Sequence, residues 1–216
     1  MEEDMLCPLC ESYSTLLCKH RQRTYYRCSG CSSAFLHPSQ RLSFAEERKR
    51  YELHNNDVED SRYQRFVTPL VEQVLSRFAP VHRGLDFGAG TGPVITKLLR
   101  DQGYDITVYD PFFYDDYQAL EQTYDYIVCC EVMEHFYHPR KSFALLKSLL
   151  KQGGSIFCRT SLFTDDIDFS AWYYKNDETH TFYYHPNSIQ WIADYFGFTQ
   201  LRVTSNSLIE FSLSQG

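Results

Sequence analysis

The chain has 216 residues with a formal net charge of −7, and 43% of its residues are hydrophobic. This length fits one domain of ordinary size plus a small appendage, with enough apolar residues for a packed core. The acidic net charge disfavours nucleic acid as a partner, because it supplies no general attraction to phosphate groups.

No apolar stretch approaches the roughly 20 residues that a membrane span needs. The first residues are acidic and do not have the basic start and apolar run of a signal peptide. We therefore expect a cytoplasmic protein that makes no contact with a membrane.

Four cysteines near the N-terminus form two pairs with two residues inside each pair, Cys7 with Cys10 and Cys28 with Cys31. This spacing is typical of a structural zinc site, in which four thiolates complete a closed tetrahedral coordination. We predict a zinc ribbon over residues 1–40. A bound zinc ion would stabilise the fold of this segment, because so short a segment cannot bury a sufficient hydrophobic core of its own.

The remaining cysteines fit other roles. Cys18 lies between the two pairs and, with His20, offers an alternative zinc ligand. Disulfides are the other use of paired cysteines, but a reducing compartment disfavours them. Three cysteines further along the chain lie in apolar strand contexts and are expected in the core: Cys129, Cys130 and Cys158.

Two helices are expected after the ribbon. The first runs from Ser43 to about residue 54 and starts with a capping-box pattern that ends at Glu46. Polar residues at 55–57 break it. The second covers about residues 61–78 with apolar residues at helical spacing, and Pro69 either kinks it or marks a new start. We interpret residues 41–80 as a helical connector or lid.

From residue 83 onward, expected strands and helices alternate, which predicts an α/β domain with a doubly wound, mostly parallel Rossmann-like sheet. Ligands of such sheets bind at the carboxyl ends of the strands. The last two strands are separated by only three residues, so they must pair in an antiparallel hairpin. The expected strands are 84–87, 105–109, 126–130, 155–159, 199–204 and 208–213, with a turn at Gly153-Gly154, and the helices are 94–101, 140–150 and 188–196.

The turn after the first of these strands is rich in glycine and reads Asp86-Phe87-Gly88-Ala89-Gly90-Thr91-Gly92. Glycines allow a tight turn and a close approach to a ligand, and the following helix offers free amide groups. A dinucleotide-binding fingerprint would place its third small residue at Pro93 rather than at Gly92. Asp86, two residues before the first glycine, suits a ligand with a positive group such as an amino-acid ammonium. The pattern resembles motif I of class I S-adenosylmethionine-dependent methyltransferases.

This resemblance implies a methyltransferase domain over residues 81–216 that binds S-adenosylmethionine through Asp86, Gly88, Gly90, Gly92 and Asp110. Asp110 ends the second strand, where a carboxylate can accept two hydrogen bonds from the ribose hydroxyls. The alternative is an acid in a surface turn.

Only about fifteen residues separate Asp110 from the next expected strand, too few for a full helix and strand. We therefore expect the edge strand to be missing or much reduced. Phe112, Phe113 and Tyr114 either cover the adenine there or pack in the core.

The segment from Cys130 to Pro139 contains an E-x-x-E-H pattern that resembles the ubiquinone-biosynthesis type of small-molecule methyltransferase. The resemblance implies that this loop lines the methionine end of the cofactor, with Glu131 as a further cofactor-binding residue. Some similar proteins bind a divalent cation there, which makes Glu131, Glu134 and His135 metal candidates. The carboxyl and imidazole groups also suit proton removal. The alternative is a capped helix start with His135 bonded to the backbone.

The aromatic stretch from Trp172 to Pro186 resembles a W…D-x-T-H segment of the same superfamily. Asp177 would orient His180, whose imidazole would then act as a general base near neutral pH. His180 is the first candidate for the base, followed by Glu131 and His135. The alternative is a structural hydrogen-bonding role for His180.

The predicted function is methyl transfer from S-adenosylmethionine to a small-molecule acceptor whose reacting atom the sequence leaves open. One alternative is a methyltransferase for RNA or protein, docked through the ribbon. It would use a basic cluster formed by Lys19, His20, Arg21, Arg23 and Arg27. Another alternative is a protein that has the fold but only binds partners.

Overall fold

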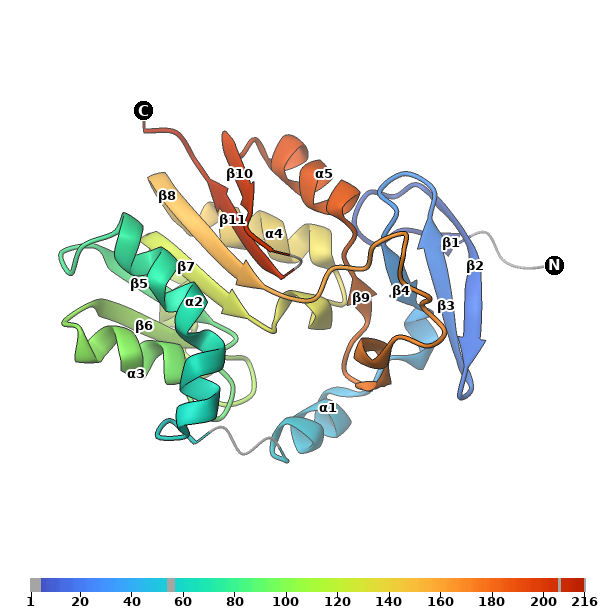
Figure 1. Cartoon of the computed structure of the whole chain (residues 1–216), viewed down its shortest axis with the longest axis horizontal. Helices are drawn as coiled ribbons and strands as arrows, with labels where there is room; N and C mark the ends of the chain where they lie inside the picture. Colours follow the sequence, from blue (N-terminus) through green and yellow to red (C-terminus); the bar gives the residue numbers. More distant parts are fainter. Residues whose placement is uncertain (1–4, 54–56, 206, 216) are drawn as a thin grey trace.

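The computed structural model describes residues 5–53, 57–205 and 207–215, which form two sheets that lie next to each other (Figure 1). The larger sheet has six strands in the order β10-β11-β8-β7-β5-β6. Its strands are β5 (Arg83–Phe87), β6 (Asp105–Tyr109), β7 (Tyr124–Cys130), β8 (Leu150–Arg159), β10 (Gln200–Val203) and β11 (Leu208–Ser212). The four strands from β5 to β8 run parallel, and β10 and β11 form the expected antiparallel hairpin beside β8.

Helices cover both faces of this sheet, because alternate residues of its buried strands point to opposite sides. Tyr126 and Val128 face α2 (Ser61–Arg77) and α3 (Val94–Asp101), in one apolar cluster. Ile127 and Cys129 face α4 (Pro139–Ser148) and α5 (Pro186–Phe196), in another cluster. This arrangement confirms the predicted α/β class.

The smaller sheet is antiparallel, in the order β1-β2-β3-β4-β9. Its first four strands come from the N-terminal segment and its fifth comes from far along the chain, as Figure 1 shows. The strands are β1 (Met5–Leu6), β2 (Tyr13–His20), β3 (Arg23–Cys28), β4 (Ala34–Leu36) and β9 (Phe182–Tyr183). The predicted ribbon therefore shares a sheet with the segment that precedes α5.

η1 (Pro38–Gln40) ends the predicted ribbon segment, and the connector then contains α1 (Phe44–Tyr51), followed by α2. Ser43 caps α1 in the expected capping box with Glu46. α2 continues through Pro69 and packs on α3 and the larger sheet. The expected end of the first helix at residue 54 and most of the polar break after it lie outside the described residues. None of the described helices has the length and apolar character that crossing a bilayer requires.

Two local features differ from simple expectations. Gly153 and Gly154 do not form the expected turn but lie inside β8, where the register shifts between Tyr124 and Tyr126 of the neighbouring strand. Gly153 has φ of +77°, so the irregular strand is built there without a steric penalty. Between Asp110 and β7 the chain forms only an isolated bridge and η2 (Tyr117–Glu121), and the sheet ends at β6. The missing edge strand was predicted.

Candidate active site

The glycine turn closes the carboxyl end of β5. Gly88 and Gly90 have φ of +79° and +65°, a region that other residues rarely adopt. The Gly88 amide donates to the Tyr109 carbonyl at 2.8 Å, which ties the turn to the end of β6. A Cβ atom at Gly88 would lie 2.6 Å from the Val132 side chain, so only glycine fits there.

Asp86 before the glycine turn and Asp110 after β6 are both buried and both already bonded to protein. Asp86 accepts a hydrogen bond from the Thr96 hydroxyl at 2.7 Å, and burial raises its pKa to about 6. Asp110 accepts from the amides of Gly90 at 2.8 Å and Phe112 at 2.8 Å. The Asp110 carboxylate thus holds the glycine turn and the following loop in one arrangement.

A cavity of about 840 Å³ extends from the glycine turn to the end of β7. Asp86, Asp110 and Gly92 line one side, and Glu131, His135 and His180 line it elsewhere. The volume lies in the range of cofactor and substrate sites.

The loop that replaces the missing strand forms part of the cavity wall together with α1. Phe112 stacks on Phe44 of α1 with ring centroids 4.4 Å apart, and Tyr51 meets it edge-on at 5.1 Å. Phe112 and Phe113 are half-buried and line the cavity. Their position therefore favours the covering role over the core role.

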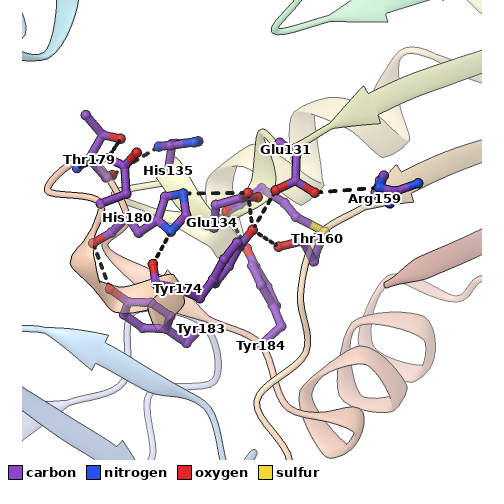
Figure 2. Close-up of polar contacts among 12 residues, drawn as sticks. Glu131, Glu134, His135, Arg159, Thr160, Tyr174, Thr179, His180, Tyr183 and Tyr184 are labelled. Carbon is purple, nitrogen blue, oxygen red and sulfur yellow. Dashed lines mark hydrogen bonds and ion pairs between the residues drawn. The ribbon is translucent and has the colours of Figure 1, made fainter. Parts of the chain in front are cut away.

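Glu131 and Glu134 form a carboxyl pair at the end of β7 (Figure 2). The Tyr174 hydroxyl lies between them, 3.1 Å from Glu131 Oε2 and in a short hydrogen bond with Glu134 Oε1. Burial and mutual repulsion raise the pKa of Glu131 to about 8, and burial raises the pKa of Glu134 to about 7. Arg159 Nε lies 3.9 Å from Glu131 Oε1, which is too far for a strong ion pair. Close to neutral pH the pair therefore retains protons that ordinary carboxyl groups have released.

The backbone of Glu131 is unusual. Its φ is +52°, in the left-handed region that non-glycine residues seldom enter. Strained backbone of this kind persists where surrounding contacts enforce it, and it often occurs at functional sites. Here the conformation places the Glu131 side chain on the cavity wall.

Two histidines complete the cluster, and each is oriented by a backbone carbonyl. His135 Nδ1 lies 3.1 Å from the Thr179 carbonyl and His180 Nδ1 lies 2.7 Å from the Tyr174 carbonyl. Because a carbonyl only accepts, Nδ1 carries the proton in both rings and Nε2 is the acceptor. Figure 2 shows His180 Nε2 facing Glu134, at 3.9 Å from its Oε1.

Two expectations for His180 are wrong. Asp177 does not orient the ring, because its carboxylate accepts instead from the amide and hydroxyl of Thr179, at 3.0 and 2.6 Å. The His180 pKa is not near neutral, since burial lowers it to about 3. The ring is a neutral hydrogen-bond acceptor at physiological pH.

The same cluster offers ligands for a cation. One ligand atom each from Glu134, His135 and His180 lies within 4.8 Å of the others, and Glu134 Oε2 is buried without a hydrogen-bond partner. The set contains His180 instead of Glu131, so it differs from the expected metal candidates.

The four paired cysteines meet in the N-terminal segment, and their sulfur atoms all lie within 4.8 Å of one another. Cys7 Sγ is 3.7 Å from Cys31 Sγ, and Cys10 Sγ is 3.3 Å from Cys28 Sγ. The amides of Gly30 and Cys31 donate hydrogen bonds to Cys28 Sγ, as backbone amides do around metal-bound thiolates. The residues therefore fit a structural zinc ion. In the described part of the chain the cluster includes neither Cys18 nor His20.

A family model described as a methyltransferase domain matches residues 60–203, more than half of the chain. The chain belongs to this methyltransferase family. The match confirms the predicted enzyme class. No curated protein matches the sequence.

Solved structures support the same fold. An O-methyltransferase family protein from Burkholderia thailandensis is 17% identical, with a TM-score of 0.54 over 79% of this chain and 63% of that one. The chain therefore spans less than two thirds of that protein. A 1,6-didemethyltoxoflavin-N1-methyltransferase from the same organism, bound to 1,6-didemethyltoxoflavin and S-adenosylhomocysteine, is 14% identical. Its TM-score is 0.53 over 94% of this chain and 99% of that one. At these identities the likeness concerns the fold.

The predicted site residues of this methyltransferase come together around one cavity, apart from the four cysteines in the ribbon. Sequence reasoning missed Tyr174, whose hydroxyl bridges the carboxyl pair and whose carbonyl holds His180. It lies in the aromatic stretch that resembles the family, but the number of tyrosines in that stretch hides it. Sequence reasoning also missed Phe44 and Tyr51 of α1 as cavity residues.

The carboxyl pair makes the stability of the methyltransferase depend on pH. A carboxyl group with a raised pKa keeps its proton in the folded state at pH values where the unfolded chain has already lost it. The free energy of unfolding therefore falls as pH rises, until the pH passes the pKa of the folded state. The lowered pKa of His180 acts only below about pH 6.5. From the shifts of Glu131 and Glu134 we expect the free energy of unfolding to fall by roughly 2 kcal/mol between about pH 6.5 and 8.5.

Urea unfolding at a series of pH values measures this dependence. The variant Glu134→Gln should show a clearly flatter profile over the same interval, because the amide cannot titrate. A stability that is constant or rises from pH 6.5 to 8.5 in the wild type would contradict the prediction.

Proposed function

We propose that this methyltransferase transfers a methyl group from S-adenosylmethionine to a small-molecule acceptor inside the cavity. The observation that supports this most is the single cavity that joins the glycine turn to Glu131 and His180. When bound, the cofactor supplies an electrophilic methyl group, so the protein has mainly to align the acceptor and exclude water. The similar B. thailandensis N1-methyltransferase has S-adenosylhomocysteine and 1,6-didemethyltoxoflavin bound, which agrees with this proposal.

The cofactor would lie along the glycine turn. Gly88, Gly90 and Gly92 leave room for a close approach to the backbone, and Asp86 adds a buried carboxyl group beneath the turn. We assign the ribose hydroxyls to Asp110, whose carboxylate also holds the turn. The methionine end would then point toward Glu131.

Glu131 is the proposed proton acceptor. It lies on the cavity wall, and its pKa of about 8 makes its carboxylate a stronger base than an ordinary glutamate. His180 has a pKa of about 3 and is a weak base, so we give it and His135 the role of orienting the acceptor through Nε2. The Tyr174 hydroxyl orients the carboxyl pair through its hydrogen bonds to Glu131 and Glu134.

These groups also indicate the chemical class of the acceptor. Glu131 and the Nε2 atoms of His135 and His180 accept hydrogen bonds, so the reacting group should arrive as a hydrogen-bond donor. A hydroxyl or an amine fits this requirement. A carboxylate or phosphate would meet lone pairs and, once Glu131 is ionised, a negative charge.

A bound divalent cation is the second candidate for acceptor activation. Glu134, His135 and His180 would hold it, and it would lower the pKa of a coordinated hydroxyl. Retained activity after chelation, in protein that still carries the ribbon zinc, would exclude this version.

Isothermal titration calorimetry with S-adenosylmethionine and S-adenosylhomocysteine tests the cofactor site. We expect Asp110→Ala to weaken binding of both by about 100-fold, because hydrogen bonds to a charged group are lost. Asp101→Ala is the matched control, since Asp101 is exposed and ends α3 away from the cavity. No binding of either compound to zinc-loaded wild-type protein at millimolar concentration would overturn the proposed function.

Docking of RNA or protein through the ribbon has less support than a small-molecule acceptor. Arg23 and Arg27 of the basic cluster already have partners within the chain, the Glu178 carbonyl and the Asp165 carboxylate. Screening cell extracts by mass spectrometry for products that gain one methyl group would identify the acceptor class.

A further inference from the structure

The ribbon contacts the segment that carries His180 through backbone hydrogen bonds. Strand β4 pairs with β9, with Ala34 opposite Tyr183 and Phe35 opposite Phe182. The Leu36 amide adds a bond to the Thr181 carbonyl at 2.9 Å, one residue after His180. The smaller sheet thus ends at β9, which begins two residues after His180 (Figure 1).

Thr181 also connects the ribbon to the carboxyl pair. The Thr181 amide donates to the Glu134 carbonyl at 2.9 Å, while its carbonyl accepts from Leu36. Thr181 is 1% exposed, so both bonds are shielded from water. A shift of β4 would therefore displace both Glu134 and His180.

Arg23 contacts the other side of the His180 segment. Its guanidinium donates to the Glu178 carbonyl at 2.7 Å, two residues before His180. Arg23 starts β3, and its guanidinium lies 6.0 Å from the centre of the Tyr25 ring. Tyr25 is fully buried and packs against Tyr183 of β9.

The hydroxyl of Tyr183 completes this support. It donates to the His180 carbonyl at 3.2 Å, as Figure 2 shows. The backbone around His180 is therefore held at Glu178 by Arg23, at Thr181 by β4, and at His180 itself by a side chain that packs on the ribbon.

We propose that the ribbon is a positioning element of the active site, and that Arg23 is the positioning residue that fixes the loop from Asp177 to Thr181 from outside. This inference rests on the proposed function only for the catalytic use of His180. It predicts that the ribbon controls the order of this loop even when no acceptor is bound.

Hydrogen–deuterium exchange of the full, zinc-loaded protein tests the proposal without an acceptor. In Arg23→Ala we expect the amides of Thr179 to Thr181 to exchange about 3- to 10-fold faster than in the wild type. This is the effect of losing one hydrogen bond from a charged group at an exposed site. Arg23→Lys should restore at least half of the protection, because an ammonium can donate to the same carbonyl. Arg21→Ala is the matched control, since Arg21 is exposed in the adjacent turn of the same hairpin.

Two further measurements separate the possible failures. The amides of α3 should keep their protection in Arg23→Ala, and S-adenosylmethionine affinity should stay within about 2-fold of the wild type. Unchanged exchange at Thr179 to Thr181 in Arg23→Ala, or equal acceleration in Arg21→Ala, would overturn the proposal. Failure of the wild type to bind S-adenosylmethionine would instead overturn the proposed function and leave the exchange result valid.

Discussion

Replacing Cys28 with serine is expected to abolish zinc binding and to unfold the ribbon. Cys28 is a buried member of the thiolate cluster and accepts hydrogen bonds from the amides of Gly30 and Cys31 on its sulfur. A structural zinc ion supplies on the order of 10 kcal/mol of folding free energy, which is comparable to the entire stability of a typical domain. Because Cys7, Cys28 and Cys31 share an apolar cluster with Tyr184 and Phe143, we expect the damage to reach the larger sheet.

Metal analysis by mass spectrometry and thermal unfolding followed by circular dichroism measure both effects. The control is Cys18→Ser, in β2 outside the cluster, which should keep one zinc per chain. A Cys28→Ser protein that retained zinc and the wild-type melting temperature would show that the cluster does not hold the metal.

Replacing Glu131 with glutamine is expected to lower the rate of methyl transfer by about 100- to 1,000-fold, the usual contribution of a general base. The amide keeps the size of the side chain but cannot take a proton. In the wild type the rate should rise with pH through about 8, because only the ionised form of Glu131 accepts the proton. The affinity for S-adenosylmethionine should change only a few-fold.

Initial rates with the acceptor found by screening, measured from about pH 6 to 9.5, give both quantities. Glu121→Gln, at an exposed position of η2, is the matched control and should leave the rate unchanged. If Glu131→Gln retained most of the activity while His180→Ala lost it, the general-base role would belong to His180.

The larger sheet was predictable because local signals mark its boundaries. Glycines and Pro93 isolate the helix Val94–Asp101, and the strand Asp105–Tyr109 lies between polar turns, so both ranges match the structure. The short connection after Asp110 also excluded a full edge strand by length alone.

The contacts across the molecule were not predictable in this way. β9 has only two residues and pairs with β4 about 150 residues earlier, a register that no local pattern encodes. The orientation of His180 depends on the carbonyl of Tyr174, and its lowered pKa depends on burial by distant segments. Residue types in the sequence identified the cluster, but only the fold determines which member holds a proton.

The segment between Asp110 and β7 also bears on solubility. An edge strand with unpaired backbone groups invites pairing with another chain, and β6 would have such an edge where the sheet ends. The η2 turn packs against β6, and the charged residues Asp115, Asp116 and Glu121 are exposed on this segment. The segment between Asp110 and β7 thus covers the edge of β6 and protects the sheet from intermolecular β-pairing. This role is separate from covering the cavity.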